Sequence, residues 1–444
     1  MLIRSKEMIL DITFGLVGIL CLIGIAYLCS NNKKKIDWRL VGIGISLQLS
    51  FAIFVLVIPG GEAVFNAIGK FFVKVISFTF DGAAFVFGIL SSQIQMEQIL
   101  PLSMQNKGLG FLFAFQVLPT IIFFSSLMSV LYHMGIMQRV VQGMAWIMAK
   151  SMRVSGAESL SVAANVFIGQ TEAPLVVRPY VSSMTQSELL TLMVGGMATI
   201  AGGVLAAYVN ILGGTDPALQ VYYAKHLLSA SIMAAPATIV IAKILIPETE
   251  HSETKGTVEL KVEKTTVNVI DAAATGAADG LKLALNVAAM LLAFIALIAM
   301  LNYILEGVGN ITGLNNLIGM PLNMYMILGY LLSPISWIIG VPWKDAVEVG
   351  SLIGEKIVIN EFISYLDLGT MIKNGVLSEK AVIIATYALC GFANFSSIAI
   401  QIGGIGGIAP DRRKDLARFG IRAVLGGSLA TFMTATIAGV LTSL

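Results

Sequence analysis

The chain has 444 residues, of which 57% are hydrophobic and only 12% are charged. Soluble domains carry about twice that share of charged residues, so the composition excludes an ordinary soluble protein and indicates a polytopic, all-α membrane protein that lies in the lipid bilayer. A formal net charge of +2, with no clustered basic face, gives no indication of nucleic-acid binding.

Apolar stretches close to the length that a helix needs to cross a bilayer recur along the chain. We predict eight spanning helices, near residues 9–29, 40–59, 109–134, 188–213, 222–246, 284–305, 381–408 and 418–442. The first stretch has the position of a signal peptide. It lacks an Ala-x-Ala cleavage site, however, and is followed at once by Lys33, Lys34 and Lys35, so we expect it to remain as a span.

The basic residues orient these spans. The three lysines at 33–35 outweigh Arg4 and Lys6 ahead of the first span, so the positive-inside rule predicts that the amino terminus lies outside. An even number of crossings returns the carboxyl terminus to the outside, and every arginine except Arg4 then lies inside. This layout places Lys225, Lys373 and Lys380 outside. These three lysines could instead mean that one span is misplaced.

Three stretches between the spans do not read as spanning helices. Residues Pro247–Lys264 mix Glu and Lys without apolar periodicity, which predicts a mobile cytoplasmic loop between two halves of the chain. The stretches Met137–Met152 and Leu305–Pro321 are too short or too polar to span, and we expect them to lie along the membrane surface.

The two halves contain related segments. Residues 157–172 end in Thr-Glu, and residues 346–361 end in Asn-Glu. Each copy continues through a polar turn into an apolar run, which small and polar residues interrupt at 198–203 in the first copy and at 391–397 in the second. Because the first copy begins inside and the second begins outside, the copies have opposite orientation. This is the inverted-repeat design of many secondary transporters.

The glutamates of these copies indicate re-entrant hairpins. Glu172 lies in the polar segment 169–174 within an apolar stretch. A carboxylate at bilayer depth costs a few kcal/mol unless it faces water, a partner or protein, and a helical hairpin with a buried tip meets that requirement. A surface turn between two ordinary helices is the alternative. The second copy favours hairpins, because it repeats the interruption at 360–362 without a proline.

Two spans are interrupted by polar residues, the fourth at Thr199 and the seventh at Asn394. Broken helices free backbone carbonyls that can hold Na⁺, and Asn and Ser side chains suit hydroxyl-rich solutes. Close helix packing is the alternative, and we adopt it for the glycines at 202–203 and 403–407. We do not adopt it for Asn394, because a carboxamide at that depth needs partners.

The chain has no nucleophile with a matching base, no metal-ligand spacing among His133, His226 and His251, and no ATP-binding loop. We therefore expect neither an enzyme nor an ATP-driven pump, and no organic cofactor. A channel is the remaining membrane alternative, and it would conduct without saturation by solute.

Three strings resemble the concentrative nucleoside transporter family. They are Gly-Gln-Thr-Glu-Ala-Pro-Leu at 169–175, Asn-Glu-Phe at 360–362 and Ala-Leu-Cys-Gly-Phe-Ala-Asn-Phe-Ser-Ser at 388–397. The likeness covers nearly the whole chain and is to the bacterial sodium-coupled type. It implies a homotrimer in the bacterial inner membrane. A scaffold would hold the oligomer, while a transport region with both hairpins and both broken helices moves like an elevator.

The resemblance also implies which residues bind the solute and the ion. The nucleobase would contact Gln170, Thr171, Glu172, Val204 and Phe392. The ribose hydroxyls would bind to Glu361, Asn394 and Ser397. Sodium would bind to Asn165, Ile168, Thr199 and Ile200, the isoleucines through their carbonyls. The residue types agree, because carboxylate and amide oxygens accept hydrogen bonds from a vicinal diol.

With this resemblance we divide the chain into five regions. They are a largely scaffold region at 1–153, a first transport repeat at 154–246, a cytoplasmic loop and connecting segment at 247–283, a scaffold region with the sixth span and a surface helix at 284–344, and a second transport repeat at 345–444.

The sequence thus predicts Na⁺-coupled symport of nucleosides into the cell, with uridine and other pyrimidine and purine nucleosides as substrates. Asn165 and Thr199 favour Na⁺, since the proton-coupled branch resembles Gly-Gln-Ser-Glu instead. Proton coupling, with Glu172 or Glu361 as carrier, stays open. So does a carrier for another small polar solute, although no arginine lies in either binding segment to attract an anion.

Overall fold

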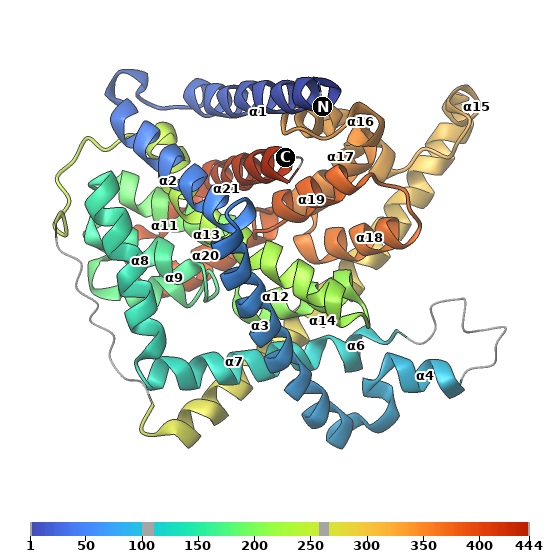
Figure 1. Ribbon diagram of the computed structural model, residues 1–444, viewed down its shortest axis with the longest axis horizontal. Helices are drawn as coiled ribbons and strands as arrows, with labels where there is room; N and C mark the ends of the chain where they lie inside the picture. Colours follow the sequence, from blue (N-terminus) through green and yellow to red (C-terminus); the bar gives the residue numbers. More distant parts are fainter. Residues whose placement is uncertain (1, 100–110, 257–265, 443–444) are drawn as a thin grey trace.

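The computed structural model describes residues 2–99, 111–256 and 266–442. Within these ranges every regular element is a helix, apart from an isolated bridge between Ser155 and Lys255, so the predicted all-α class is confirmed (Figure 1). The start of the span predicted at 109–134, and residues 257–264 of the predicted loop, lie outside the described residues.

Eight stretches among the described helices are long and apolar enough to cross a membrane. They are Met8–Leu28, Trp38–Leu56, Pro59–Ile99, Phe113–His133, Gln186–Gly213, Pro217–Leu245, Val269–Thr312 and Pro410–Leu441. This set differs from the predicted spans in two places: it includes Pro59–Ile99, and the span predicted at 381–408 consists of two shorter helices.

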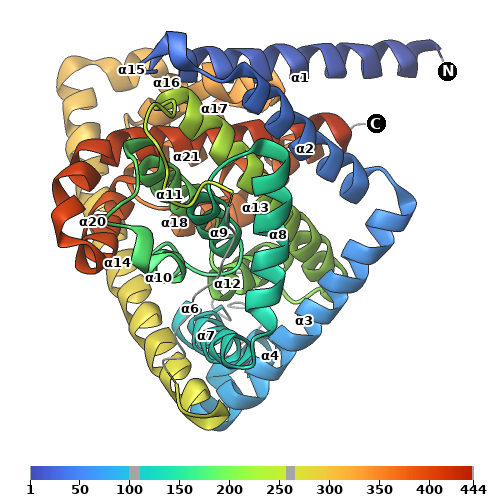
Figure 2. The same cartoon turned by 90° about the vertical axis from the view of Figure 1, so that its left-hand side faces the viewer.

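The amino-terminal helices cover one side of the molecule. Helix α1 (Leu2–Leu28) lies across the top of Figures 1 and 2 and packs on α21 (Arg413–Leu441). A short turn η1 (Lys33–Lys35) leads to α2 (Trp38–Leu56), which begins where the Asp37 carboxylate accepts hydrogen bonds from two backbone amides of the first turn. Both helices also pack on α13 (Pro217–Leu245).

Helix α3 (Pro59–Phe87) corrects the sequence analysis, which placed no span between residues 59 and 109. Charged residues such as Lys70 and Lys74 interrupt the apolar run in the sequence. In the structure the residues of α3 that are buried recur along one face, from Phe65 to Ala83, and Lys70 is exposed. The helix continues through η2 (Gly88–Ser91) to α4 (Gln93–Ile99).

Helix α14 (Val269–Thr312) is the longest element, with 44 residues. It extends beyond both ends of the span predicted at 284–305. Much of the surface helix predicted at Leu305–Pro321 is therefore the continuation of α14, and the short α15 (Leu314–Ile318) follows. It packs along α7 (Leu118–His133), which follows the short α6 (Phe113–Gln116). Figure 2 shows α14 and α3 along opposite edges of the molecule.

The close packing of α14 on α7 depends on glycine. A Cβ atom at Gly280 would lie 2.8 Å from the Ile122 Cα atom and 2.8 Å from the Ser125 Cβ atom, so only glycine lets the two helices approach this closely. After α7 comes α8 (Ile136–Met152), which matches the other stretch that we predicted as a surface helix and buries one face, including Val141 and Ala145.

The first repeat forms an interrupted hairpin and an interrupted helix. The hairpin consists of α9 (Gly156–Asn165), a tip, α10 (Ala173–Val176) and the turn η3 (Arg178–Tyr180). The following helix is α11 (Gln186–Ala198), which breaks and resumes as α12 (Gly202–Gly213) before α13.

The second repeat has the same order of elements. Helix α16 (Met324–Ile338) and the turn η4 (Trp343–Asp345) precede a hairpin of α17 (Ala346–Val358) and α18 (Glu361–Lys373). Helix α19 (Glu379–Ala388) then breaks and resumes as α20 (Phe395–Ile408), and the turn η5 (Pro410–Arg412) leads into α21.

The helices form an inner bundle and an outer layer. In the most apolar stretch of α11–α12, of α13 and of α21, 89% of the residues are buried inside the protein. In the corresponding stretch of α1, of α3 and of α14, only 17% are buried. The outer helices therefore present large apolar side chains at the surface, among them Phe85 of α3 and Tyr303 of α14. Such surfaces are expected where lipid or another subunit replaces water.

The two interrupted helices meet at their interruptions. Gly391 lies between α19 and α20, and a Cβ atom there would approach the carbonyl oxygen of Met197, in the last turn of α11, to 2.7 Å. Residue 391 must therefore be a glycine for the segment between α19 and α20 to contact the end of α11. The contact brings the polar residues of both interruptions into one region at the centre of the bundle.

The described part of the loop predicted at 247–264 is largely exposed but makes hydrogen bonds to two helices. The Ser252 hydroxyl donates to Glu188 at the start of α11 (2.5 Å), and the Thr254 carbonyl accepts from the Gly156 amide at the start of α9 (2.9 Å). Ser252 and Thr254 are buried. This segment therefore ties the beginnings of α9 and α11 together.

Candidate functional site

A cavity of about 1300 Å³ opens where both hairpin tips and both helix interruptions converge against α7 and α14. Eight residues that the resemblance assigned to solute binding line it. They are Gln170, Thr171, Glu172, Val204, Glu361, Phe392, Asn394 and Ser397. Segments more than 200 residues apart in the sequence thus contribute to one site. Gln170 and Ser397, for example, come from two such segments and are joined by a hydrogen bond.

Glu361 is buried at one end of this cavity. The Asn360 side chain accepts from the Ile363 amide (3.1 Å) and starts α18, so that Glu361 is the first residue of that helix. One carboxylate oxygen of Glu361 accepts from the Tyr208 hydroxyl (3.0 Å) and the other accepts from the Asn394 side-chain amide (2.9 Å). The carboxylate is therefore held by donors from both interrupted helices.

Asn394 supplies the partners that its carboxamide needs. It is the N-cap of α20, and its side-chain oxygen accepts from the Ser397 amide (2.8 Å) and from the Ser396 hydroxyl (2.7 Å). The side-chain NH₂ consequently points to Glu361. One of its two N–H groups makes that bond, and the second is free to donate to a ligand.

Gln170 lies at the tip of the first hairpin and is oriented by Gln401 of α20. The Gln401 NH₂ group donates to the Met193 carbonyl (2.9 Å) and to the Gln170 side-chain oxygen (3.1 Å). Because a backbone carbonyl only accepts, this arrangement fixes which way both carboxamides face. The Gln170 NH₂ group therefore points to the Ser397 hydroxyl (3.0 Å), and its second N–H is available for an acceptor on a solute.

Glu172 differs from Glu361 in its surroundings. It is exposed at the cavity wall, whereas Glu361 is only 4% exposed. Asp279 and Lys282 of α14 line the same cavity and form an exposed ion pair of 3.3 Å. Glu172 is thus the more accessible of the two carboxylates, although both line the cavity.

The residues assigned to sodium lie where the hairpin touches the break between α11 and α12. Asn165 is the last residue of α9, and its NH₂ group donates to the Ser161 carbonyl (3.0 Å). Its side-chain oxygen is buried and has no hydrogen-bond donor among the described residues. Thr199 and Ile200 are also buried, and the Thr199 hydroxyl donates to the Gly195 carbonyl (2.9 Å).

This set offers amide, hydroxyl and carbonyl oxygens rather than transition-metal ligands. Among the described residues no three His, Cys, Asp or Glu side chains gather as a metal site. Hard oxygen ligands without a strong charge suit an alkali cation. Of these four residues only Ile168 lines the large cavity, so the residues assigned to sodium lie mostly behind its wall.

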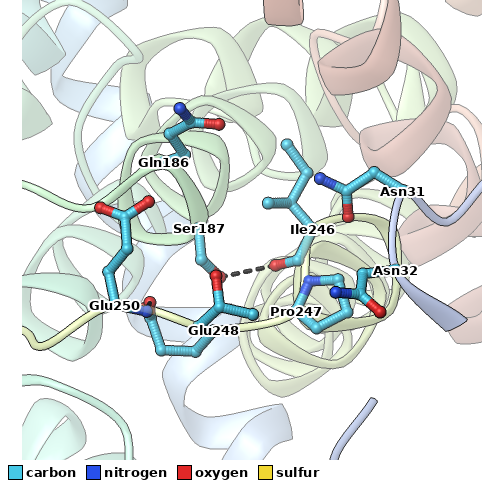
Figure 3. A pocket seen from close by; sticks show the side chains of 9 residues that line it. Asn31, Asn32, Gln186, Ser187, Ile246, Pro247, Glu248 and Glu250 are labelled. Carbon is cyan, nitrogen blue, oxygen red and sulfur yellow. Dashed lines mark hydrogen bonds between the residues drawn. The ribbon is translucent and has the colours of Figure 1, made fainter. Parts of the chain in front are cut away.

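A second, much smaller pocket of about 60 Å³ lies at the beginning of α11 and the end of α13 (Figure 3). The Ser187 hydroxyl donates to the Ile246 carbonyl there (2.6 Å), and Glu248 lies beside them. The space holds only a few water molecules. Since α11 starts about 18 Å from its break, this pocket is separate from the solute cavity.

Three polar residues in or near the site were missed by the sequence analysis. Tyr208 and Gln401 orient Glu361 and Gln170, and Lys356 of α17 is completely buried. A signal was present for each, because a tyrosine, a glutamine or a lysine inside an apolar run requires a partner. The partners themselves are distant in the sequence.

Comparisons with known proteins agree with this geometry. Three family models match the chain: the Na⁺-dependent nucleoside transporter amino terminus at residues 17–90, nucleoside recognition at 114–215, and the Na⁺-dependent nucleoside transporter carboxyl terminus at 226–439. Together they cover most of the chain.

Two bacterial relatives and a solved structure match this chain over almost their whole length. The chain is 45% identical to an uncharacterized transporter of Haemophilus influenzae (97% of this chain, 98% of the relative) and 39% identical to the nucleoside permease NupC of Helicobacter pylori (97% and 98%). The structure of CNTnw in an inward-facing substrate-bound state matches with a TM-score of 0.87 and 45% identity, covering 97% of this chain and 99% of that chain. The chain therefore belongs to the concentrative nucleoside transporter family, whose members are transporters and not enzymes.

Proposed function

We propose that this chain is a Na⁺-coupled symporter that carries nucleosides into the cell. The observation that carries the proposal is the buried carboxylate of Glu361, which two donors hold at the cavity wall between both helix interruptions. A vicinal diol offers two hydroxyl donors that a carboxylate can accept, so a ribose fits this end of the cavity. Asn394 and Ser397 complete the ribose end.

The nucleobase would lie toward the first hairpin. Val204 and Phe392 supply apolar walls, while Gln170, Thr171 and Glu172 supply polar groups. Every common nucleobase has a carbonyl or ring-nitrogen acceptor, and the oriented NH₂ group of Gln170 suits such an acceptor. This chemistry supports uridine as a substrate together with other pyrimidine and purine nucleosides.

Sodium would be carried with the solute at Asn165, Ile168, Thr199 and Ile200. The support is the buried Asn165 oxygen, which has no hydrogen-bond donor among the described residues and stands beside a broken helix. One positive charge that moves down 100 mV gains about 2.3 kcal/mol. At about 1.4 kcal/mol per tenfold, that is enough for about 50-fold accumulation of a neutral nucleoside.

For the mechanism we propose an elevator-type movement of both repeats against a scaffold. The repeats, residues 154–246 and 345–444, contain the hairpins and interrupted helices, and the scaffold at 1–153 and 284–344 contributes α7 and most of α14. The exposed apolar side chains of α14, including Leu292 and Tyr303, support contact with lipid or with other subunits of a homotrimer. We place the trimer in a bacterial inner membrane with both termini outside.

Proton coupling through Glu361 is less well supported. Both of its oxygens accept hydrogen bonds from neutral groups, so a proton on the carboxylate would have to displace the Asn394 donor or reverse the bond to Tyr208. Glu172, exposed at the cavity wall, is the better alternative proton carrier.

The test is uptake of radiolabelled uridine by purified protein in proteoliposomes, with Na⁺ replaced by choline at fixed pH. We expect uptake to require Na⁺ and to saturate with uridine. Equal uptake in choline would refute sodium coupling, and no saturable uptake of any nucleoside would refute the substrate class.

A further inference from the structure

Lys356 is a buried cation that the solute site described so far does not use. It lies on α17, a little more than one turn before Glu361, and its side chain is completely buried. No carboxylate oxygen of the described residues lies within 4.0 Å of its side-chain nitrogen. A lysine at this depth requires a specific partner.

The partners are groups at the interruption of the second repeat. The Lys356 nitrogen donates to the Ala388 carbonyl (2.7 Å) and to the Thr431 hydroxyl (3.1 Å). Ala388 is the last residue of α19, so its carbonyl belongs to the end of a half-helix, where carbonyls lack intrahelical donors and the helix dipole is negative. The ammonium group therefore neutralises a broken helix end.

Thr431 can only be an acceptor in this contact. Its hydroxyl hydrogen is donated to the Ser428 carbonyl (3.0 Å) on the same helix, α21. The lysine nitrogen thus stands among oxygens that offer lone pairs, and the ring of Phe432 lies 6.0 Å away. This is an environment for a cation, and the protein supplies that cation itself.

The first repeat has a corresponding place without a cationic side chain. Asn165 ends α9 beside the break after α11, as Lys356 lies near the end of α17 beside the break after α19. The Asn165 side-chain nitrogen and the Thr238 methyl group, on α13 after the first interruption, both border Gly195, and Thr431 of α21 is hydrogen-bonded to Lys356 after the second interruption.

The two places differ in their hydrogen-bond donors. The Asn165 side-chain oxygen and the Thr238 hydroxyl are buried without a hydrogen-bond partner among the described residues. In the second repeat the Ala388 carbonyl and the Thr431 hydroxyl accept hydrogen bonds from Lys356. One interruption therefore has acceptors that need a cation, and the other has acceptors that already hold one.

We propose that the Lys356 ammonium is a tethered cation that takes, in the second repeat, the place of sodium in the first. Because it is covalently attached, it holds the α19–α20 interruption, and with it Asn394 of the ribose end, whether or not ions are present. Only the first repeat then responds to the ion, which limits coupling to one Na⁺ for each nucleoside. This last step rests on the proposed sodium coupling.

Two substitutions separate the charge from the shape of the side chain. Lys356→Asn removes the ammonium, leaves space and supplies a carboxamide oxygen like that of Asn165. Lys356→Met keeps a long side chain without charge and leaves no room for an ion. Each variant is purified and reconstituted beside the wild type, and the initial rate of uridine uptake is measured against Na⁺ concentration, with choline as replacement at fixed pH and voltage.

We expect the wild type to respond to Na⁺ with a Hill coefficient of about 1, and Lys356→Asn with a coefficient of about 2, because a second ion enters the vacated place. Lys356→Met should lose uptake by about tenfold or more at every Na⁺ concentration, since its acceptors stay unpaired. A Hill coefficient of about 1 in Lys356→Asn, or full uptake by Lys356→Met, overturns the proposal.

A stability measurement answers the same question if the variants transport too slowly. The midpoint of thermal unfolding is compared in NaCl and in choline chloride without nucleoside, since an ion that binds only the folded protein raises it. The rise caused by Na⁺ should be larger in Lys356→Asn than in the wild type and no larger in Lys356→Met. Equal rises in all three proteins contradict a tethered cation.

The result that would refute the proposed sodium coupling differs from the result that would refute the tethered cation. Wild-type uptake that is equal in Na⁺ and choline would refute coupling at the first repeat. The tethered cation would still require that Lys356→Asn acquire a response to Na⁺ that the wild type lacks.

Discussion

The Tyr208 hydroxyl donates to one oxygen of the Glu361 carboxylate over 3.0 Å and so joins α12 of the first repeat to α18 of the second. The Tyr208 ring stacks on Tyr365, with ring centroids 4.2 Å apart, and is completely buried. The side chain that orients the candidate ribose acceptor is therefore itself rigid.

Tyr208→Phe removes the hydroxyl and keeps the stacked ring. Glu361 then loses one of its two donors, and a hydrogen bond to a charged group contributes about 1.5–3 kcal/mol. We expect uridine binding to weaken by about tenfold or more while thermal stability changes little. Isothermal titration with purified protein measures this effect. Tyr330→Phe, at an exposed tyrosine of α16, is the matched control and should bind like the wild type.

Glu361→Gln replaces an acceptor of two hydrogen bonds by a group that accepts at only one of its two positions. The Asn394 NH₂ group or the Tyr208 hydroxyl then faces an NH₂ group, and a ribose diol loses its carboxylate acceptor. We expect nucleoside binding to be abolished while the elution volume in size-exclusion chromatography, which reports the proposed trimer, stays that of the wild type. Retained affinity for uridine in the purified variant would show that the ribose assignment is wrong.

The broken helices could be predicted because their signals are local, and the polar segments expected at the hairpin tips are local in the same way. A Glu next to Thr171 or Asn360 in an apolar stretch, and Asn394 at a helix start, are visible in a few consecutive residues. The structure brings these segments to one cavity. Helix α3 was missed for the converse reason, because its apolar face is discontinuous in sequence and charged residues such as Lys70 lie on its exposed side.

The positioning residues could not be predicted from local pattern. Tyr208 and Glu361 are separated by 153 residues, and Gln401 and Gln170 by 231. Such pairs depend on how the two repeats interlock, and a single sequence does not encode that arrangement in any short string. The positive-inside layout leaves Lys225 on the outer side, and its partner is likewise remote in sequence: the Glu62 carboxylate of α3, at 3.1 Å.

Gln401→Glu tests whether Gln401 orients Gln170. A carboxylate cannot donate to the Met193 carbonyl or to the Gln170 oxygen, so the Gln170 carboxamide becomes free to turn over. We expect uridine affinity to fall by about threefold to tenfold, with a changed ratio of uridine to adenosine uptake in competition experiments. Gln220→Glu breaks a comparable bond to the Gly214 carbonyl, remote from the cavity, and should leave that ratio unchanged.

Asn165→Ala tests the ion position. The substitution removes the buried oxygen that lacks a hydrogen-bond donor. Asn165 is not one of the residues that line the solute cavity, so these residues stay unchanged. We expect the Na⁺ concentration for half-maximal uridine uptake to rise by about tenfold, with uptake at saturating Na⁺ less affected. An unchanged Na⁺ dependence would exclude Asn165 as a ligand of the coupling ion.

At the beginning of α9 and α11, Lys243 joins the ends of several elements. Its ammonium nitrogen lies 2.5 Å from a Glu158 oxygen and 3.1 Å from a Glu248 oxygen, and it donates to the Ser187 hydroxyl (2.9 Å). The Thr185 hydroxyl also donates to Glu248 (2.8 Å). Glu248 lies beyond Leu245, the last residue of α13, and Pro247, so it is outside the spanning segments and in the wall of the small pocket.

Glu248 predicts a pH dependence of stability. Partial burial raises the pKa of its carboxyl group, but the attraction of Lys243 and the hydrogen bonds outweigh burial and hold the pKa below its usual range. A folded-state pKa below the unfolded one stabilises the protein above about pH 4.3, and this contribution is lost as pH falls through the folded pKa. We therefore expect the midpoint of thermal unfolding to fall between about pH 5 and pH 3, and to fall less in Glu248→Gln. The matched control is Glu250→Gln, at an exposed neighbour, which should follow the wild type. Parallel curves for the wild type and Glu248→Gln would mean that this carboxylate does not stabilise the junction of α9, α11 and α13.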